Sequence, residues 1–382
     1  MVTFNLQKEL QNLINASVLE VVKLSGVSGL ENLLSSGERV EVIATESAFK
    51  QAGNLVVSTL KKLGVSCALY LTPNGEPFPY KSHGKFGAKV IALGDSDYLN
   101  SILLSPEAKS APIILLPTSP NLENLNLNAT AVVIDEGIIS KSNGEEFSKA
   151  FLSVMAKPLA LIDYKMSSYL KGKNPTSETF NAVKKAVAIA SKVTSYSNYK
   201  TAILGAEIIL LSVCASCEVL SSSGEFSIYN ALKLFSTGFS ESDLRFTSLE
   251  KTAKLYHLFF SNDFSDLLSY PDYQEDIKIL CEKTGEDANI YIERIKAPGK
   301  KRAELIYLLL AKTRGDFLKE TGAILKALAG IKKIYLAIKK ESEVASLYYK
   351  NLKNAVMVAP YMQKTENTLT LLREMGVLKC IN

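Results

Sequence analysis

The chain has 382 residues, of which 47% are hydrophobic and 22% are charged, and its formal net charge is +5. This length predicts two domains, and the composition is typical of a soluble globular protein. The positive charge is small for the length and the lysines are scattered among acids, so we expect no nucleic-acid partner.

The cysteines and the longest apolar run indicate a reducing, cytoplasmic location without membrane segments. The five cysteines are an odd number at irregular spacing, which argues against a disulfide framework. Residues 1–24 carry charges and do not form a signal peptide. The apolar run 202–215 is interrupted by Glu207 and is too short to span a bilayer, so it predicts a buried helix.

The first 160 residues alternate between strand and helix patterns. Short apolar strands are predicted at 39–45, 66–72, 89–94, 112–118 and 130–135. Between the first two, residues 46–64 place apolar side chains at helical spacing. Apolar strands separated by helices predict a parallel sheet covered on both faces. The first domain is therefore predicted to be α/β and Rossmann-like.

After Asp135 the periodicity becomes helical and stays so to the C-terminus. Breaks are predicted at 171–175, 269–272, 296–300 and Gly330, where Gly and Pro cluster or interrupt the pattern. The second domain is therefore predicted to be all-α. We assign residues 1–155 to the α/β domain and residues 156–382 to the helical domain.

Several segments resemble, in order, those of the dehydroquinate synthase-like superfamily, which includes iron-containing alcohol, glycerol and glycerol-1-phosphate dehydrogenases. KVIALGDSDYLN (89–100) takes the place of a strand followed by Gly-Gly-Gly-Ser-x-x-Asp, and IILLPTSPN (113–121) that of a strand ending in Pro-Thr-Thr. SSSGEFSIYNAL (221–232) and SLEKTAKL (248–255) resemble two histidine-bearing metal motifs. The ending 358–376 most resembles the glycerol-1-phosphate branch. This resemblance implies NAD(P), a divalent metal and the two-domain fold predicted above.

The segment that resembles the cofactor loop departs from the superfamily pattern. Consecutive glycines there would let the backbone approach a pyrophosphate, but only Gly94 remains, and Asp95 and Ser96 follow it. A carboxylate about 4 Å from a phosphate charge is repelled by several kcal/mol. One alternative is a variant nucleotide-binding loop. We favour a polar turn with Asp95 or Ser96 as helix N-cap. We predict vestigial cofactor-binding positions at Gly94, Asp95, Ser96, Pro117 and Thr118.

The positions that resemble metal ligands also depart from the pattern. The superfamily holds Zn, Fe or Ni with one Asp and two His, and these positions fall on Ser153, Phe226 and Ser248. A phenyl ring has no donor atom and a neutral hydroxyl is a poor ligand, so we expect no metal. The chain has only two histidines. Candidates for a rebuilt site in the cleft between the domains are Glu225, Glu250 and His257.

Three functions stay open. We favour a non-catalytic relative that keeps this cleft as a binding or assembly module for a small phosphorylated or polyol ligand, without NAD(P) or metal. The second is an active NAD(P)-dependent polyol or polyol-phosphate dehydrogenase with a rearranged metal site. The third is a metal-free enzyme of another class. A homodimer is expected in each case because an edge strand needs a partner, and an active paralogue is a further candidate partner.

Overall fold

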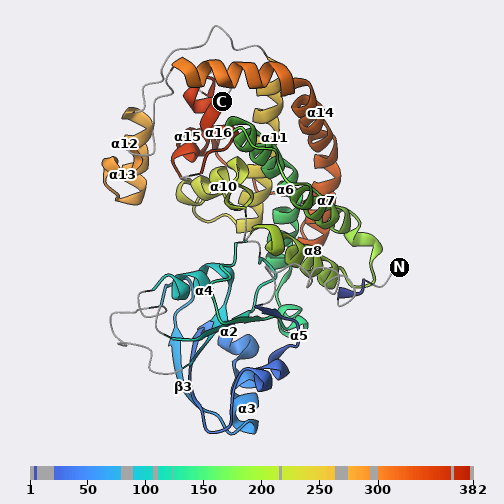
Figure 1. Cartoon of the computed structure of the whole chain (residues 1–382), viewed down its shortest axis with the longest axis vertical. Helices are drawn as coiled ribbons and strands as arrows, with labels where there is room; N and C mark the ends of the chain where they lie inside the picture. Colours follow the sequence, from blue (N-terminus) through green and yellow to red (C-terminus); the bar gives the residue numbers. More distant parts are fainter. Residues whose placement is uncertain are drawn as a thin grey trace. The chain divides into compact units, whose positions relative to one another are not determined.

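The computed structural model describes residues 4–6, 21–78, 89–105, 111–122, 124–214, 217–262, 274–292, 300–362 and 365–378. By packing, the chain divides into two compact units, 1–150 with 188–216, and 151–187 with 217–382 (Figure 1). From the sequence we expected one boundary, after residue 155. The chain instead leaves the α/β unit after Ala150 and returns to it for residues 188–216. Within the described ranges, no helix is both long and apolar enough to cross a membrane.

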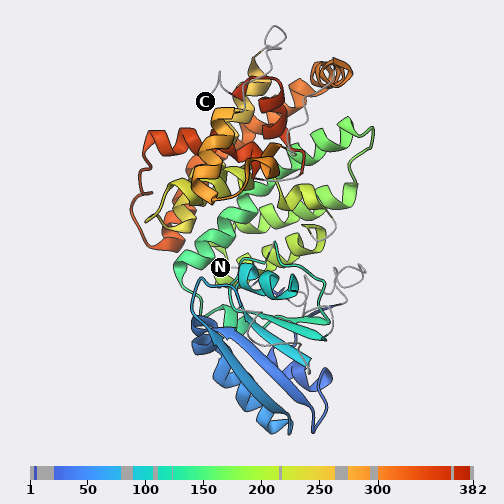
Figure 2. The same ribbon diagram turned by 90° about the vertical axis from the view of Figure 1, so that its left-hand side faces the viewer.

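The α/β unit is built on a six-stranded parallel sheet, visible edge-on and obliquely in the two views (Figures 1 and 2). The strand order is β1-β6-β5-β4-β2-β3. The strands are β1 (Val22–Lys23), β2 (Arg39–Thr45), β3 (Ser66–Thr72), β4 (Lys89–Gly94), β5 (Ile113–Pro117) and β6 (Ala131–Val133). The five predicted strands are confirmed. β1 was missed because two residues are too few to show a periodic pattern.

Burial explains why these strands read as continuous apolar runs. Residues Val90–Gly94 of β4 and all of β5 are buried, as expected for parallel strands covered on both faces. On one face, Val56 and Leu60 join the core cluster that contains Val40 and Val42 of β2. The α/β architecture predicted from the alternating pattern is therefore confirmed.

Short polar residues at the ends of three strands begin the helices that follow. Thr45, Asp95 and Asp135 each accept a hydrogen bond from the backbone N–H three residues later, at 3.2, 2.9 and 3.0 Å. Such N-caps satisfy a donor that the first helical turn leaves open. The helices of this unit are η2 (Val27–Asn32), α2 (Glu46–Ala48), η3 (Phe49–Gly53), α3 (Asn54–Lys62), α4 (Ser96–Leu103), α5 (Glu136–Ile139), η6 (Val193–Ser195) and α8 (Tyr199–Cys214).

The second unit is helical throughout its described residues, as predicted. Its elements are α6 (Gly144–Leu170), which starts in the first unit, α7 (Ser177–Ser191), α9 (Glu218–Ser221), α10 (Gly224–Phe235), α11 (Glu241–Ser261), α12 (Gln274–Thr284), α13 (Ala288–Ile292), α14 (Lys300–Lys339), α15 (Tyr349–Val358), η7 (Ala359–Tyr361) and α16 (Thr368–Glu374). The predicted break at Gly330 is wrong, because α14 runs through it to Lys339. Gly330 is exposed there, and an exposed helical glycine costs only about 1 kcal/mol relative to Ala.

One buried carboxylate joins four elements of the helical unit. Asp163 of α6 is fully buried. It accepts hydrogen bonds from the backbone N–H of Gly224 and of Thr368, each at 2.8 Å, and from the Tyr256 hydroxyl at 2.8 Å. Gly224 and Thr368 are the first residues of α10 and α16, whose N-terminal partial charges favour an anion. Asp163 therefore fixes two helix starts against α6 and α11.

Burial raises the pKa of Asp163 above its ordinary value of 3.8, although its hydrogen bonds act in the opposite direction. Between the ordinary and the raised pKa, the unfolded chain has released this proton while the folded chain keeps it. The contribution of Asp163 to stability therefore falls as the pH rises through that window.

Replacing Asp163 by Ala is expected to lower the free energy of unfolding by about 3–5 kcal/mol, because three buried donors lose their acceptor. Tyr256→Phe, which removes one of the three donors, is the matched control and should cost about 1 kcal/mol. Urea denaturation followed by circular dichroism measures both. Equal losses in the two variants would show that Asp163 does not have this joining role.

Candidate functional site

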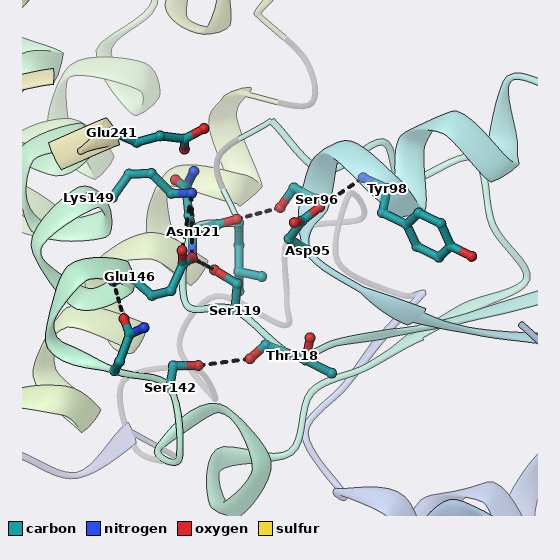
Figure 3. Close-up of polar contacts among 12 residues, drawn as sticks. Asp95, Ser96, Tyr98, Thr118, Ser119, Asn121, Ser142, Glu146, Lys149 and Glu241 are labelled. Atoms are coloured by element: carbon teal, nitrogen blue, oxygen red, sulfur yellow. Dashed lines mark hydrogen bonds and ion pairs between the residues drawn. The ribbon is translucent and has the colours of Figure 1, made fainter. Parts of the chain in front are cut away.

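The turn after β4 is closed by its own side chains rather than open to a ligand (Figure 3). The carboxylate of Asp95 accepts the N–H of Tyr98 and so uses one of the donors that a phosphate would bind at the start of α4. Ser96 donates its hydroxyl to the Asn121 carbonyl. The polar turn with Asp95 as N-cap, which the sequence favoured, is the arrangement observed.

Gly94 is needed here for packing. A methyl group on Gly94 would lie 2.5 Å from Cδ1 of Tyr98, so the glycine makes room for that ring. The Tyr98 side chain is buried, and Thr72 donates its hydroxyl to the Tyr98 hydroxyl at 2.6 Å. In a dinucleotide-binding loop the bare glycine lets the backbone approach a phosphate. In this chain the Tyr98 ring lies against Gly94 instead.

The surroundings of the turn are acidic. Burial raises the pKa of Asp95, and the charges of Asp97 and Glu146 raise it further. Glu146 accepts the hydroxyl of Ser119 at 2.6 Å, and Lys149 lies 3.5 Å from the same carboxylate (Figure 3). A pyrophosphate placed here would meet more negative than positive charge.

Pro117 and Thr118 complete this edge of the sheet. Pro117 ends β5, and Thr118 donates its backbone N–H to the Gly94 carbonyl at 2.9 Å. The Thr118 carbonyl accepts the hydroxyl of Ser142 at 2.9 Å and the amide of Gln51 at 2.8 Å. The structure therefore brings together the loop positions that the sequence singled out, and their backbone polar groups bond to one another and to neighbouring side chains.

In the helical unit, the three positions that resemble metal ligands carry no good ligand. Ser153 on α6 is 1% exposed, and its hydroxyl has no hydrogen-bond partner among the described residues. Ser248 on α11 is fully buried and donates its hydroxyl to Glu225 and, at 2.8 Å, to the Arg245 carbonyl. Phe226 on α10 presents its ring to the guanidinium of Arg245, 5.2 Å from the ring centroid.

A buried ion pair lies beside these positions. Nε of Arg245 is 3.3 Å from Oε1 of Glu225, and the two side chains are only 3% and 1% exposed. The guanidinium carbon is also 4.9 Å from the centroid of the Tyr229 ring, so two aromatic rings flank the cation. The charge close to Phe226 and Ser248 is thus a guanidinium, which stays protonated at any pH the protein experiences.

The three candidates for a rebuilt metal site have other partners. Glu225 is in the ion pair with Arg245, and Glu250 pairs with Lys254 on the surface at 2.7 Å. Nδ1 of His257 lies 3.1 Å from the Thr321 hydroxyl. In the part of the chain that the structure describes, no group of three or more His, Cys, Asp or Glu side chains could hold a metal ion. The second histidine, His83, lies outside the described residues.

Comparison with solved structures identifies the fold. The alcohol dehydrogenase from Oenococcus oeni matches with a TM-score of 0.55 and 12% identity, over 95% of this chain and 98% of that chain. An archaeal halo-thermophilic alcohol dehydrogenase from a Red Sea brine pool matches with a TM-score of 0.53 and 10% identity, over 95% and 96%. This chain has the fold of these alcohol dehydrogenases. No protein-family model matches the sequence, and no curated protein matches it significantly.

The described residues do not fit the two cofactors that this fold implies. At the turn after β4, the Asp95 carboxylate takes a backbone donor that a pyrophosphate would bind, and the Tyr98 ring packs against Gly94. At the metal positions, Phe226 has no donor atom and the Ser248 hydroxyl bonds to Glu225. Arg245 adds a fixed positive charge that would repel a divalent cation.

Sequence reasoning missed Arg245 and Asp163. Both lie in segments that read simply as amphipathic helix, and their partners are distant in sequence or on another helix. A signal was present at Arg245, because a charged residue three positions before Ser248 falls on the same face of α11. Had this face been recognised as buried, the arginine would have required a partner.

Replacing Arg245 by Met is expected to lower the free energy of unfolding by about 3–5 kcal/mol, since it leaves Glu225 charged and buried without its cation. Adding Glu225→Gln should recover much of the lost free energy of unfolding, because the uncompensated charge is then gone. Urea denaturation of the single and double variants measures this coupling.

The exposed pair Glu250–Lys254 on the same helix is the matched control. Lys254→Met, alone or with Glu250→Gln, should change stability by less than about 0.5 kcal/mol, because exposed pairs contribute little. A double variant at Arg245 and Glu225 that is no more stable than Arg245→Met alone would contradict the account of a coupled buried pair.

Proposed function

We propose that this protein is a non-catalytic relative of the NAD(P)- and metal-dependent glycerol and glycerol-1-phosphate dehydrogenases. In this proposal it acts in the cytoplasm as a binding or assembly module, without a nicotinamide cofactor and without a bound metal. The observation that carries the proposal is the Arg245–Glu225 ion pair, which lies beside the positions that resemble metal ligands.

Two features at different places support the same proposal independently. In the α/β unit, the Asp95 carboxylate binds the N–H of Tyr98, a donor that a dinucleotide-binding loop keeps open, and the Tyr98 ring packs on Gly94. In the helical unit, Ser248 bonds to Glu225 and Phe226 lies against Arg245. A hydride-transfer enzyme of this kind needs both the cofactor and the Lewis acid, so the loss of either would stop the reaction.

The alternative, an active dehydrogenase with a rearranged site, requires Glu225, Glu250 or His257 to bind a metal. Glu225 could do so only by giving up Arg245, which would leave that cation buried without a carboxylate. Glu250 and His257 pair with Lys254 and Thr321, respectively. These contacts favour the non-catalytic function.

The proposal is tested by titrating the protein with NADH and NADPH and by assaying alcohols, polyols and polyol phosphates with and without Zn²⁺, Fe²⁺ or Ni²⁺. We expect no cofactor fluorescence enhancement and no turnover. A thermal-shift screen with polyols and sugar phosphates, without nucleotide, then tests for the ligand of a binding module. Cofactor-dependent turnover by the unmodified chain would overturn the proposal.

A variant that restores ligands provides the matched control for metal binding. Ser153→Asp, Phe226→His and Ser248→His, combined with Arg245→Ala, should bind Zn²⁺ in an equilibrium titration if these positions correspond to the superfamily ligands. The unmodified chain should not. Circular dichroism establishes that the variant is folded before its titration is interpreted.

We further propose that the protein forms a homodimer through β3. This strand is an edge of the sheet in the described structure and pairs with β2 over seven residues without a bulge. Its sequence, SCALYLT, has no charge and no proline, the usual protections of an exposed edge. Leu69 and Leu71 are 42% and 48% exposed on one face. Pairing of two β3 strands about a twofold axis would cover both edges with one self-complementary surface.

Light scattering coupled to size exclusion tests the dimer. The unmodified protein should elute at twice its chain mass of 41.7 kDa, and the variant Leu69→Lys with Leu71→Lys at the single-chain mass. The control replaces two other exposed leucines, Leu55 and Leu104, by Lys and should leave the dimer intact. A monomeric unmodified protein, or equal dissociation of both variants, would rule out this interface.

A further inference from the structure

The outer face of α14 has a composition unlike the rest of the surface. The helix runs along the edge of the helical unit in Figure 1, and its inner side packs on α11. The Phe317 ring lies tilted against Phe260, 4.9 Å between centroids, and the Tyr335 ring is stacked 5.6 Å from Phe246. On the outer side, between 319 and 340, all ten exposed residues are Lys, Ala or Gly. The one acid in this stretch, Glu320, pairs with Lys165, and no large apolar side chain is exposed here.

The lysines on this face recur every seven residues. Lys319, Lys326 and Lys333 lie in α14, and Lys340 directly follows its last residue; we call these four the lysine row. Lys312 continues the spacing by one step toward the N-terminus. Seven residues rise about 10 Å along a helix, so neighbouring members lie about one Debye length apart and repel each other weakly. None of the four has an ion-pair partner among the described residues.

Small residues separate the members of the row. On the exposed side, Ala323 lies between the first two lysines, Ala329 and Gly330 between the next two, and Ala337 before the last. Addition of a Cβ at Gly330 would meet no atom within 4 Å, so nothing in the described structure covers this position. A partner backbone could therefore approach the helix closely between the lysines.

The seven-residue period identifies the kind of partner. A stripe repeating every seven residues drifts slowly around a helix, and it stays in contact only with a second helix that wraps around the first. A second copy of α14 is excluded, because the two lysine rows would repel each other. Apart from Lys332, the exposed lysines of this stretch all belong to the row, and the row has no Arg and no aromatic residue, the groups that bind phosphates and stack on bases.

We propose that the lysine row is a docking surface for an acidic α-helix of another protein, with carboxylates seven residues apart. Each lysine would pair with one carboxylate, and the alanines and glycines would let the two helices lie close together. Because exposed ion pairs are individually weak and screened by salt, binding should be strongly salt-dependent. This inference does not depend on whether the protein is catalytic.

The test uses the full chain and a fluorescently labelled peptide of about 28 residues, long enough to form a helix, rich in Ala and Gln, with Glu at every seventh position. The comparison peptide has the same composition with Glu at every fifth position, which spreads the charges around the helix. In fluorescence anisotropy titrations at low salt, the peptide with Glu at every seventh position should bind at least about tenfold more tightly than the comparison peptide.

A set of protein variants locates the binding surface. Replacing Lys319, Lys326, Lys333 and Lys340 by Gln should weaken binding of the peptide with Glu at every seventh position at least about tenfold. The matched control makes the same change in net charge at four other exposed lysines, Lys61, Lys62, Lys171 and Lys173, and should change binding less than about twofold.

Three results would overturn the proposal. Equal binding of the two peptides would show that the spacing of the carboxylates does not matter. This comparison needs no protein variant. Equal weakening by both sets of substitutions would show that only net charge matters. Tighter, row-dependent binding of phosphatidylserine vesicles or duplex DNA than of the peptide would show that the partner is not a helix.

Discussion

A guanidinium taken out of water must keep a carboxylate beside it, and this requirement governs the centre of the helical unit. Arg245 cannot lose its proton, so its burial is tolerable only while Glu225 stays charged and close. The Glu225 carboxylate also accepts a hydrogen bond from the Ser248 hydroxyl. Around this one pair, the carboxylate, the Ser248 hydroxyl and the two flanking rings all contact the guanidinium or its partner.

The turn after β4 follows the same principle in the other unit. A fold that binds ligands at strand ends must keep backbone donors open there. In this chain, Asp95 takes one such donor and the Tyr98 ring packs on Gly94. The strand and its glycine therefore have an architectural role here, and a fold alone does not establish a function.

The strands and the fold class were predictable because they rest on local patterns. β2, β3 and β4 have the predicted bounds, since buried parallel strands are short apolar runs flanked by polar turns. The break expected at Gly330 failed because tertiary packing of α14 on α11 outweighs one glycine. The return of residues 188–216 to the α/β unit was also unpredictable, because it depends on contacts such as that of Glu207 with the Leu122 amide, 85 residues away.

The candidate site was predictable only in part. The sequence singled out the loop positions and the positions that resemble metal ligands, because each set lies within contiguous motifs. It could not reveal the buried contacts around them, since Arg245 and Glu225 come from different helices and Asp163 joins segments up to 205 residues apart. The lysine row was hidden for a different reason. Between 321 and 340 the sequence has lysines and no acid, but only the helix geometry shows which of these lysines share one exposed face of α14.

The central claim, that the protein's own ion pair replaces the metal, is tested most directly by a crystal structure of protein grown with excess Zn²⁺. Anomalous scattering data on either side of the zinc absorption edge would locate any bound ion. The account predicts no anomalous peak near Ser153, Phe226 or Ser248, with the Arg245 guanidinium held between Glu225 and the two rings. A zinc peak ligated by Glu225, with Arg245 displaced, would contradict it.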